Sequence, residues 1–434
     1  MGKMLAFLLL ACAPDEGLAV SAYTPDDALA FVDGAEGRVR AHYSDRGPNA
    51  ADQTDQDEDD IPDQAEYLAA ATESALRFYG TLGFAAPLSE SEVGLDPVGG
   101  SDALDVYLLT DGPFGTFLDG CVGARCAVHL VAPADDGSFD LGRAAFYAVM
   151  AAYDVDEPAW LAEGAAWHMS NRLDGGSLSN IGDGDAWLRV PSCGLAAMVR
   201  GNTCANAAYG AGLMWWYLAD AVGPDVLRDT IEATVTLDGV DALEAGLAAN
   251  DAALDEVWPE IIACNLATGP RGGRDACYSF GSMFDGVTAD AEGATVRTDT
   301  TLVPLSARYY RVDHGGGAFS VAASGDLAHL VATVHPVEDG AADGPLTEAI
   351  GPFALDGDAP AALDDVPAGG VWVAVSHVDA HADVADVHLC IGATADVTPC
   401  ASAAGCSSTG TLPTRSLPVL ALLAALGVRR RSRP

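Results

Sequence analysis

The stretch LGRAAFYAVMAAYDVDEPAWLAEGAAWHMS, residues 141–170, carries the strongest fold signal in the chain. Residues 141–153 are mostly alanine and other helix-forming residues, which predicts a first helix. An acidic linker follows, and residues 158–171, in which Trp160 and Trp167 flank the pair Glu163-Gly164, predict a second helix. From the residues alone, this pattern is typical of an amphipathic helix hairpin with a tryptophan-rich core.

The same stretch resembles the core of zinc metallopeptidases of the gluzincin type. In those enzymes a helix with H-E-x-x-H precedes a second helix with W-L-x-E-G-x-A, whose glutamate is the third zinc ligand. More specifically, it is similar to a metalloprotease-like family of myxobacterial surface proteins. Matching residues 146–154 to that family's helix places Arg143 at the first histidine, Ala144 at the catalytic glutamate and Tyr147 at the second histidine. Glu163 occupies the position of the third ligand.

The resemblance covers residues 40–400 and includes the flanking segments 105–108, 209–210 and 309–312. It implies a zincin-like metallopeptidase domain, made of a small sheet with helices. It does not imply activity, because three of the four functional positions have changed.

Coordination chemistry gives the reason. A catalytic zinc ion needs three protein ligands and an open water position, and two imidazoles four residues apart on a helix supply two of them. Arg143 is a permanent cation, Tyr147 is a phenol that stays protonated near neutral pH, and Ala144 offers no base. His168 follows Glu163 by five residues and does not share its helix face. We therefore expect no bound zinc and no catalytic residue, as in a pseudoenzyme.

The same three positions predict what replaces the metal. Arg143 and Tyr147 are i,i+4 neighbours, so both should face the surface where Glu163 would have met zinc. A partly buried glutamate needs a partner, and a guanidinium supplies paired hydrogen bonds. The sequence predicts an Arg143–Glu163 ion pair with the Tyr147 hydroxyl nearby.

Composition excludes several other functions. The chain has 434 residues, half of them apolar, and a formal net charge of −42. Such a surface repels nucleic acid and anionic lipid and suits binding of divalent cations. Lys3 is the only lysine, so Schiff-base chemistry and a lysine-dependent phosphate loop are excluded once a leader segment is removed.

The cysteines indicate export. Eight of the ten fall into close pairs, which predicts four local disulfides rather than zinc ligation, because no C-x-x-C occurs. The predicted pairs are Cys121–Cys126, Cys193–Cys204, Cys264–Cys277 and Cys390–Cys400. Cys12 and Cys406 stand alone near the two ends.

Both ends resemble sorting signals. Residues 1–22 predict a signal peptide, which is either a lipobox with Cys12 as the lipidated residue or an ordinary cleavage site near residues 20–22. Residues 401–434 begin with a flexible stalk around Cys406 and continue with the apolar run 417–428 and the arginine cluster 429–433. This tail is similar to the C-terminal sorting signal of myxobacterial surface proteins. The resemblance implies attachment near Cys406 and a location at the outer membrane or cell surface, with release outside the cell as the alternative.

The segment DQDEDDIPDQAE, residues 55–66, has the spacing of a calcium-binding loop. Carboxylates or a backbone carbonyl fall at relative positions 1, 3, 5, 7, 9 and 12, the ligand offsets of a seven-coordinate cation. The candidate ligands are Asp55, Asp57, Asp59, the carbonyl of Ile61, Asp63 and Glu66. Asp60 stands where the sharp turn favours glycine, so we expect weaker binding. Calcium is the predicted cofactor; a merely solvated acidic run is the alternative.

The predicted fold class is α+β, with a metallopeptidase-like domain over residues 23–280 and a β-sandwich of about eight strands over residues 290–400. Glycines at 269–273 mark the predicted boundary. Helices are predicted at 63–82, 141–153, 158–171, 207–222, 224–235, 239–248 and 251–266. Strands are predicted at 38–43, 105–109, 126–131, 309–312, 318–321, 327–334 and 371–376, and 126–131 is expected to be an edge strand.

The histidines favour structural roles. His377 and His381 lie in a loop of the predicted β-region with His388 on the next strand, and metal binding by this group is the weaker interpretation. His42, His129 and His168 stand singly and are expected to be structural.

Three functions are consistent with these patterns. The first is an exported, surface-sorted and non-catalytic binding or structural module, holding an extracellular peptide, protein or matrix by strand addition at residues 126–131. The second is an active metal-dependent peptidase with other ligands, drawn from Asp154, Asp156, Glu157 and Glu163. The third is a calcium-dependent adhesion or matrix protein. Nucleic acid is not an expected partner, and membrane association is expected only through the terminal signals.

Overall fold

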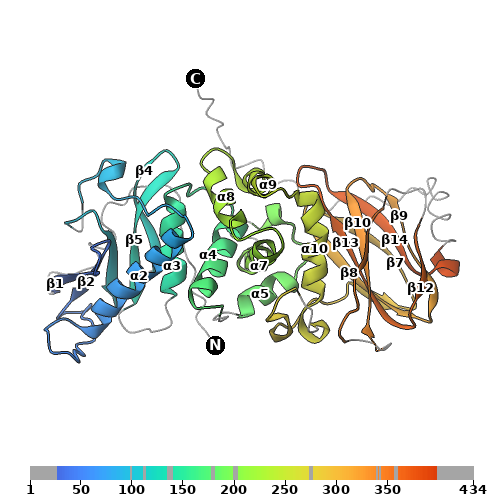
Figure 1. Cartoon of the computed structure of the whole chain (residues 1–434), viewed down its shortest axis with the longest axis horizontal. Helices are drawn as coiled ribbons and strands as arrows, with labels where there is room; N and C mark the ends of the chain where they lie inside the picture. Colours follow the sequence, from blue (N-terminus) through green and yellow to red (C-terminus); the bar gives the residue numbers. More distant parts are fainter. Residues whose placement is uncertain are drawn as a thin grey trace, which may run out of the picture.

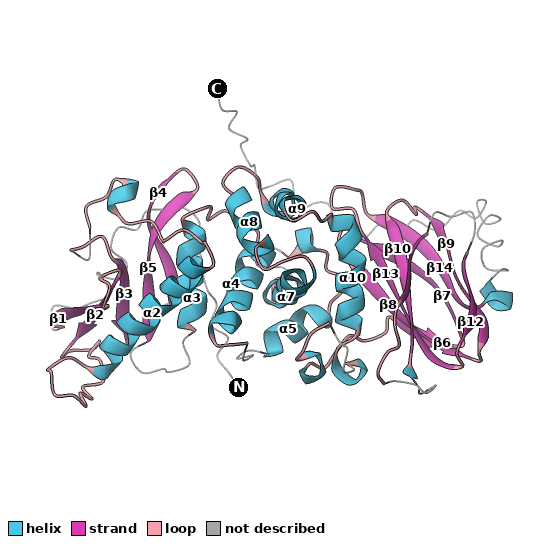
Figure 2. Ribbon diagram, in the orientation of Figure 1, coloured by secondary structure: helices cyan, strands magenta, loops and turns pink. Residues whose placement is uncertain are grey.

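The computed structural model describes residues 27–397 except for short gaps at 98–99, 111–113, 134–139, 177–180, 199–203, 273–276, 339–340, 342–343 and 356–359. The described chain is mixed α+β, as the sequence predicted. A first sheet lies at one end of the long axis, helices occupy the middle, and two further sheets lie at the other end (Figures 1 and 2). The predicted terminal signals, including Cys12 and Cys406, fall outside the described residues.

The first sheet has five strands in the order β1-β2-β3-β5-β4. Its strands are β1 (Leu29–Asp33), β2 (Val39–Ser44), β3 (Leu104–Leu109), β4 (Gly115–Val122) and β5 (Arg125–Pro133). Strands β2, β3 and β5 run parallel, and β1 and β4 pair antiparallel at the two edges. The expectation that residues 126–131 form an edge strand is therefore wrong. They belong to β5, which lies between β3 and β4, and β4 was not foreseen because its GTFLDGCV sequence contains two glycines.

Two helices cover one face of this sheet (Figure 2). They are α2 (Asp63–Thr81) and α3 (Leu141–Ala151). Helix α2 buries a helical stripe against the sheet, and Thr72 is fully buried among its apolar residues, which are Ala65, Leu68, Ala69, Leu76 and Tyr79. Alternate residues of the strands, such as Val106 and Leu108 of β3, pack into the same core.

The middle of the molecule is helical. Its elements are α4 (Ala159–Leu173), α5 (Ile181–Leu188), α6 (Ala207–Gly210), α7 (Gly212–Ala221), α8 (Val226–Ala233), α9 (Gly239–Ala249) and α10 (Leu254–Leu266). The tryptophan-rich core expected here is present, and Trp160 stacks on Trp215 with ring centroids 6.4 Å apart. The single helix expected at 207–222 is divided into α6 and α7 beside Gly210 and Gly212, since glycine weakens a helix interior.

The C-terminal region forms two sheets. One has the order β11-β10-β13-β8-β6 and the other β12-β9-β14-β7. Their strands are β6 (Ala291–Gly293), β7 (Thr295–Leu302), β8 (Ala307–His314), β9 (Gly317–Gly325), β10 (Leu330–Pro336), β11 (Ile350–Ala354), β12 (Ala361–Val366), β13 (Gly369–His377) and β14 (Ala385–Ala393). Side chains of both sheets, among them Val373 and Leu389, belong to one apolar cluster.

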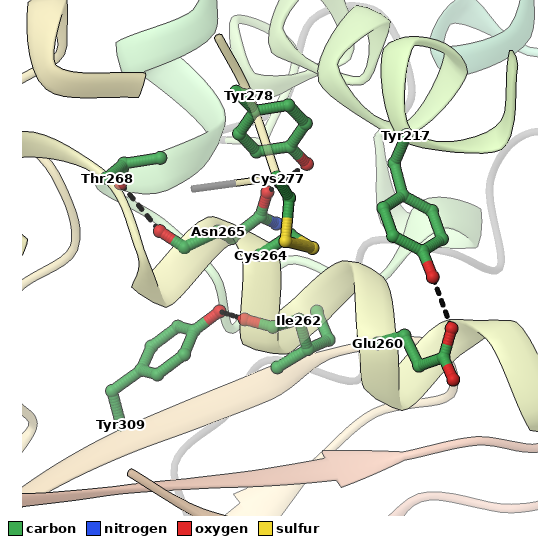
Figure 3. The surroundings of a disulfide bond; sticks show 9 residues. All are labelled: Tyr217, Glu260, Ile262, Cys264, Asn265, Thr268, Cys277, Tyr278 and Tyr309. Atoms are coloured by element: carbon green, nitrogen blue, oxygen red, sulfur yellow. Dashed lines mark hydrogen bonds between the residues drawn. A yellow bond between two sulfur atoms is a disulfide. The ribbon is translucent and has the colours of Figure 1, made fainter. Parts of the chain in front are cut away.

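Helix α10 packs directly against the strands that follow it. The Tyr309 hydroxyl of β8 donates to the carbonyl of Ile262 in α10 at 3.0 Å (Figure 3). The buried Arg271 donates to the carbonyl of Leu266 and lies over the Trp372 ring of β13, 4.3 Å from its centroid. Residues of α10, β8 and β13 share one apolar cluster. The elements on either side of the boundary predicted at 269–273 are therefore packed together.

Three of the predicted disulfides are formed: Cys121–Cys126, Cys193–Cys204 and Cys264–Cys277. Figure 3 shows the third, beside Tyr278, whose hydroxyl donates to Asn265. The fourth prediction, Cys390–Cys400, cannot be placed because Cys400 lies outside the described residues. Disulfides fit a protein of an oxidising compartment outside the cytoplasm. Among the helices described, none is long and apolar enough to cross a membrane.

Candidate functional site

Helices α3 and α4 place the residues that the sequence analysis aligned with a metallopeptidase motif. The first turn of α3 is capped by Asp140, whose carboxylate accepts the backbone N–H of Arg143 at 2.8 Å. The same carboxylate accepts the Ser170 hydroxyl of α4 at 2.6 Å, which ties the two helices together. Arg143 and Tyr147 consequently project from adjacent turns of α3 toward Glu163 of α4.

The glycine after Glu163 has a packing role. A Cβ atom on Gly164 would lie 3.0 Å from the backbone of Ala211 and Gly212, and one on Gly212 would lie 2.2 Å from the Trp167 ring. Helix α4 therefore crosses the start of α7 at a distance that only glycines allow. Close packing of α4 on α7 therefore accounts for Gly164.

The Arg143–Glu163 ion pair predicted from the sequence is confirmed. The Nη2 atom of Arg143 lies 3.0 Å from Oε2 of Glu163, and the Tyr147 hydroxyl donates to the same oxygen. Only 5% of Arg143 and 3% of Glu163 is exposed. A buried charge pair of this kind is tolerated because each charge is matched by hydrogen bonds.

Two further residues complete the surroundings of Arg143. Its Nη1 lies 3.4 Å from Oδ2 of Asp183 in α5, and its guanidinium lies over the ring of Tyr209, 4.5 Å from the centroid. Burial raises the pKa of Asp183, although the Arg143 charge opposes that shift. Asp183 and the helix α5 that carries it were not predicted from the sequence. Tyr209 was noted only as part of a flanking segment.

The space beside this network is small. Thr116 of the edge strand β4 donates its hydroxyl to the carbonyl of Ala144 at 3.1 Å, so β4 is attached to the first turns of α3. A cavity of about 20 Å³ remains next to Tyr147, which is room for about one water molecule. Chemically, the arrangement holds Glu163 as an ion-paired acceptor and leaves little room for a substrate group.

A separate carboxylate cluster lies at the far side of that cavity. Asp154 and Glu157, from the α3–α4 linker, meet Asp238 at the start of α9, with one oxygen of each within 4.8 Å of the others. Glu157 accepts the N–H of Gly239 at 3.0 Å. Burial, together with the neighbouring aspartates, raises the pKa of Glu157 to about 7. Of the alternative ligands considered from the sequence, Asp154 and Glu157 are brought together, and Glu163 is not part of the group.

The acidic loop at 55–66 gathers its predicted ligands. Side-chain oxygens of Asp55, Asp57 and Asp63 lie within 4.8 Å of one another, and so do those of Asp57, Asp59 and Glu66. The Asp55 carboxylate also accepts backbone N–H groups of Glu58, Asp59 and Asp60, which folds the loop around it. The loop thus forms two overlapping groups of carboxylates that share Asp57.

The electrostatics of this loop favour a cation. The pKa of Asp57 is raised, chiefly by the charge of Asp59. Burial and then the charges of the loop aspartates raise the pKa of Glu66. Asp60, at the sixth position, has φ = 70°, the left-handed region that favours glycine, as the sequence analysis anticipated for this turn.

The histidines lie apart from both groups. His168 is fully buried, packs edge-on against Trp216 and makes no hydrogen bond with its ring nitrogens. His42 pairs with Asp105 at 2.8 Å and His129 with Asp119 at 2.5 Å on the first sheet. These contacts fit the structural roles expected from the sequence.

The β-region histidines do not form the group considered from the sequence. His377 contacts the carbonyl of Asp383 at 3.1 Å, and His388 pairs with Asp299 at 2.8 Å. His381 instead faces Asp241 and Glu244 of α9. That contact could not be predicted from the sequence, because α9 and the loop of His381 are far apart in the chain.

Comparison with known proteins yields little. No family model matches the chain, and no curated protein matches it. Among solved structures, the chain is similar to Aeromonas hydrophila PliG, a periplasmic inhibitor of g-type lysozyme, with 10% identity, coverage of 24% of this chain and 98% of that chain, and a TM-score of 0.18. It is also similar to the pre-peptidase C-terminal domain of collagenase from Bacillus anthracis, with 12% identity, coverage of 24% and 95%, and a TM-score of 0.17. Neither likeness assigns a fold family or a function.

Proposed function

We propose that this protein is an exported, non-catalytic binding or structural module built on a zinc-metallopeptidase-like scaffold, with a C-terminal β-sandwich. The observation that carries the proposal is the buried contact between Arg143 and Glu163. A guanidinium there supplies the positive charge that a metal ion would otherwise supply. Because Tyr147 donates to the same oxygen, the ligand face of Glu163 is engaged by protein groups.

The free-energy cost of breaking the Arg143–Glu163 pair supports a structural role for it. Removing one partner of a buried ion pair leaves an uncompensated charge and costs about 3–5 kcal/mol. The pair therefore favours the closed packing of α3 on α4 rather than an open metal site. The attachment of Thr116 to Ala144 and the small cavity beside Tyr147 point the same way.

We propose that an extracellular peptide or protein segment is held by strand addition at β4, the edge of the first sheet. Near the Cys121–Cys126 turn, Leu88, Glu92, Val122 and Arg125 line an open cavity of about 230 Å³, which is large enough for a side chain. Val122 is 59% exposed there. This replaces the original assignment of the docking strand to residues 126–131.

The decisive experiment introduces the zinc-binding motif at the aligned positions of α3. The triple variant Arg143→His, Ala144→Glu and Tyr147→His restores H-E-x-x-H on α3. If the scaffold is of the metallopeptidase type, this variant gains a tightly held equivalent of zinc, and the same variant carrying Glu163→Gln does not. Purified wild-type protein with tightly bound zinc and casein hydrolysis abolished by Glu163→Gln would overturn the non-catalytic assignment.

A second function is favoured by the acidic loop. Its gathered carboxylates, with a raised pKa at Asp57, support a calcium-dependent surface adhesion or matrix role. Calcium-dependent binding of the wild-type protein to cells or matrix, lost in Asp57→Asn, is the expected result. Sorting to the outer membrane or cell surface through the terminal signals belongs to the same proposal.

A further inference from the structure

We propose that Asp241, Glu244 and His381 form a binding site for a transition-metal dication, with zinc as the best fit, between helix α9 and the loop that joins β13 to β14. Asp241 and Glu244 are three residues apart and share one face of α9. His381 reaches them from the opposite side of the junction between the helices and the C-terminal sheets. One ligand atom of each residue lies within 4.8 Å of the other two.

The distances are those of a long ion pair, and they are also compatible with a metal ion shared by the three side chains. Nε2 of His381 lies 3.5 Å from Oδ1 of Asp241 and 3.4 Å from Oε2 of Glu244. A charged N–H···O hydrogen bond is shorter, at about 2.7–2.9 Å. Ligand atoms bound tetrahedrally to zinc at about 2.1 Å stand about 3.4 Å from one another. The spacing of the imidazole from both carboxylates is close to two edges of such a tetrahedron, so a zinc ion fits between them without a large rearrangement.

The histidine is presented by an anchored loop. The Asp379 carboxylate accepts the backbone N–H of His381 at 2.8 Å, and it also pairs with His329 of the neighbouring loop at 3.2 Å. Further along, the carbonyl of Asp383 contacts Nε2 of His377 in β13 at 3.1 Å. Anchoring on both sides of His381 limits the entropy that is lost when a metal fixes the ring.

The charges at this position are unbalanced. Within the described chain, no arginine lies within ion-pair distance of Asp241 or Glu244, and His381 is their ion-pair partner. Two carboxylates and one imidazole give the site an excess of negative charge, on a chain whose net charge is −42. A dication neutralises this excess, and the surrounding field raises its local concentration.

The ligand chemistry selects the kind of metal. Calcium and magnesium prefer sites made of oxygen atoms, whereas an imidazole with two carboxylates suits zinc and its neighbours in the transition series. The side chains are 58%, 42% and 58% exposed for Asp241, Glu244 and His381, so water can occupy the remaining position. The bound ion would cross-link α9 to the β13–β14 loop. This site does not depend on the proposed function, because none of its ligands contacts Glu163 or the acidic loop.

The test uses the complete exported protein after removal of metals with a chelator. Zinc at saturating concentration should raise the melting temperature by about 3 °C or more. His381→Ala and Glu244→Gln should each abolish the shift. His388→Ala is the matched control, because His388 is also an exposed histidine paired with a carboxylate, and it should keep the full shift.

Two outcomes would overturn the site. The first is a wild-type protein that does not respond to zinc; if His381→Ala also melts lower without metal in that case, the cluster is an ion pair only. The second is a His381→Ala variant that keeps the full response. Asp57→Asn, which affects the acidic loop, should leave the zinc shift unchanged, so failure of the calcium proposal would be seen separately.

Discussion

The carboxylate of Glu157 accepts the backbone N–H of Gly239 at 3.0 Å, and this bond joins the α3–α4 linker to the first residue of α9. Burial is the main cause that disfavours the ionised form of Glu157, and the charges of Asp154, Asp238 and Asp156 disfavour it further, against the opposing effect of the Gly239 hydrogen bond. The pKa of Glu157 is accordingly raised from 4.5 to about 7.

This shift predicts a pH effect on stability. Below pH 4.5 the carboxyl is protonated in both the folded and the unfolded chain. Between pH 4.5 and 7 the unfolded chain ionises first, so the free energy of unfolding falls as the pH rises, by about 2 kcal/mol in total. Glu157→Gln keeps an acceptor for Gly239 and should remove this slope, which denaturant unfolding at several pH values measures. Equal slopes for the two proteins would contradict the prediction.

His168 should produce the opposite dependence. Burial, with a smaller contribution from the nearby Arg172 charge, lowers the pKa of its imidazole from 6.5 to about 3. The ring is neutral in the folded protein, so stability is full above pH 6.5. It is lost progressively as the pH falls toward 3, because the unfolded chain binds the proton. His168→Leu should be less acid-sensitive by about 3 kcal/mol at pH 4, measured by denaturant unfolding at pH 4 and pH 8. If the free energy of unfolding changes between pH 4 and pH 8 by the same amount in His168→Leu and in the wild type, the prediction is wrong.

The Arg143–Glu163 pair can be tested by a double-mutant cycle. Arg143→Met should reduce the free energy of unfolding by about 3–5 kcal/mol, because Glu163 is left buried without its cation. The double variant Arg143→Met/Glu163→Gln should recover much of that loss, since no uncompensated charge remains. Additive losses in the double variant would show that the two side chains are not coupled.

Asp60 offers a gain-of-stability test in the acidic loop. Its φ of 70° is unfavourable for a residue with a Cβ atom, so Asp60→Gly should stabilise the turn by about 1 kcal/mol. We expect this variant to show a larger calcium-dependent rise in melting temperature than the wild type, and Asp57→Asn to show a smaller one. If Asp60→Gly and Asp57→Asn both respond to calcium as the wild type does, the loop is not a calcium site.

Periodicity allowed much of the regular structure to be predicted. The buried stripe of α2 and the strand β2 follow directly from side-chain spacing, and so do most of the helices between α3 and α10. The Arg143–Glu163 contact was also predictable, because spacing along two neighbouring helices determines which side chains meet. Local patterns carried this information because the contacts concerned are close in sequence.

Contacts between distant segments could not be predicted in this way. Helix α5 is short and contains two glycines, so its sequence gave no helical signal, and Asp183 was missed with it. Whether a strand is at an edge depends on which strands pair with it, so β5 was misplaced at the edge and β4 was overlooked. The meeting of His381 with Asp241 depends on the docking of α9 beside the C-terminal sheets, which no local pattern records.

The helical middle of the molecule is connected to its C-terminal sheets by the buried Tyr309 hydrogen bond to α10, by Arg271 lying over the Trp372 ring and by a shared apolar cluster. Cutting the chain between α10 and β6 would expose Trp372 and leave the Tyr309 hydroxyl without its acceptor in α10. Neither fragment would then keep the thermal stability of the whole protein. The intact protein should therefore melt in a single calorimetric transition, although the first sheet, the helices and the C-terminal sheets follow one another along its long axis.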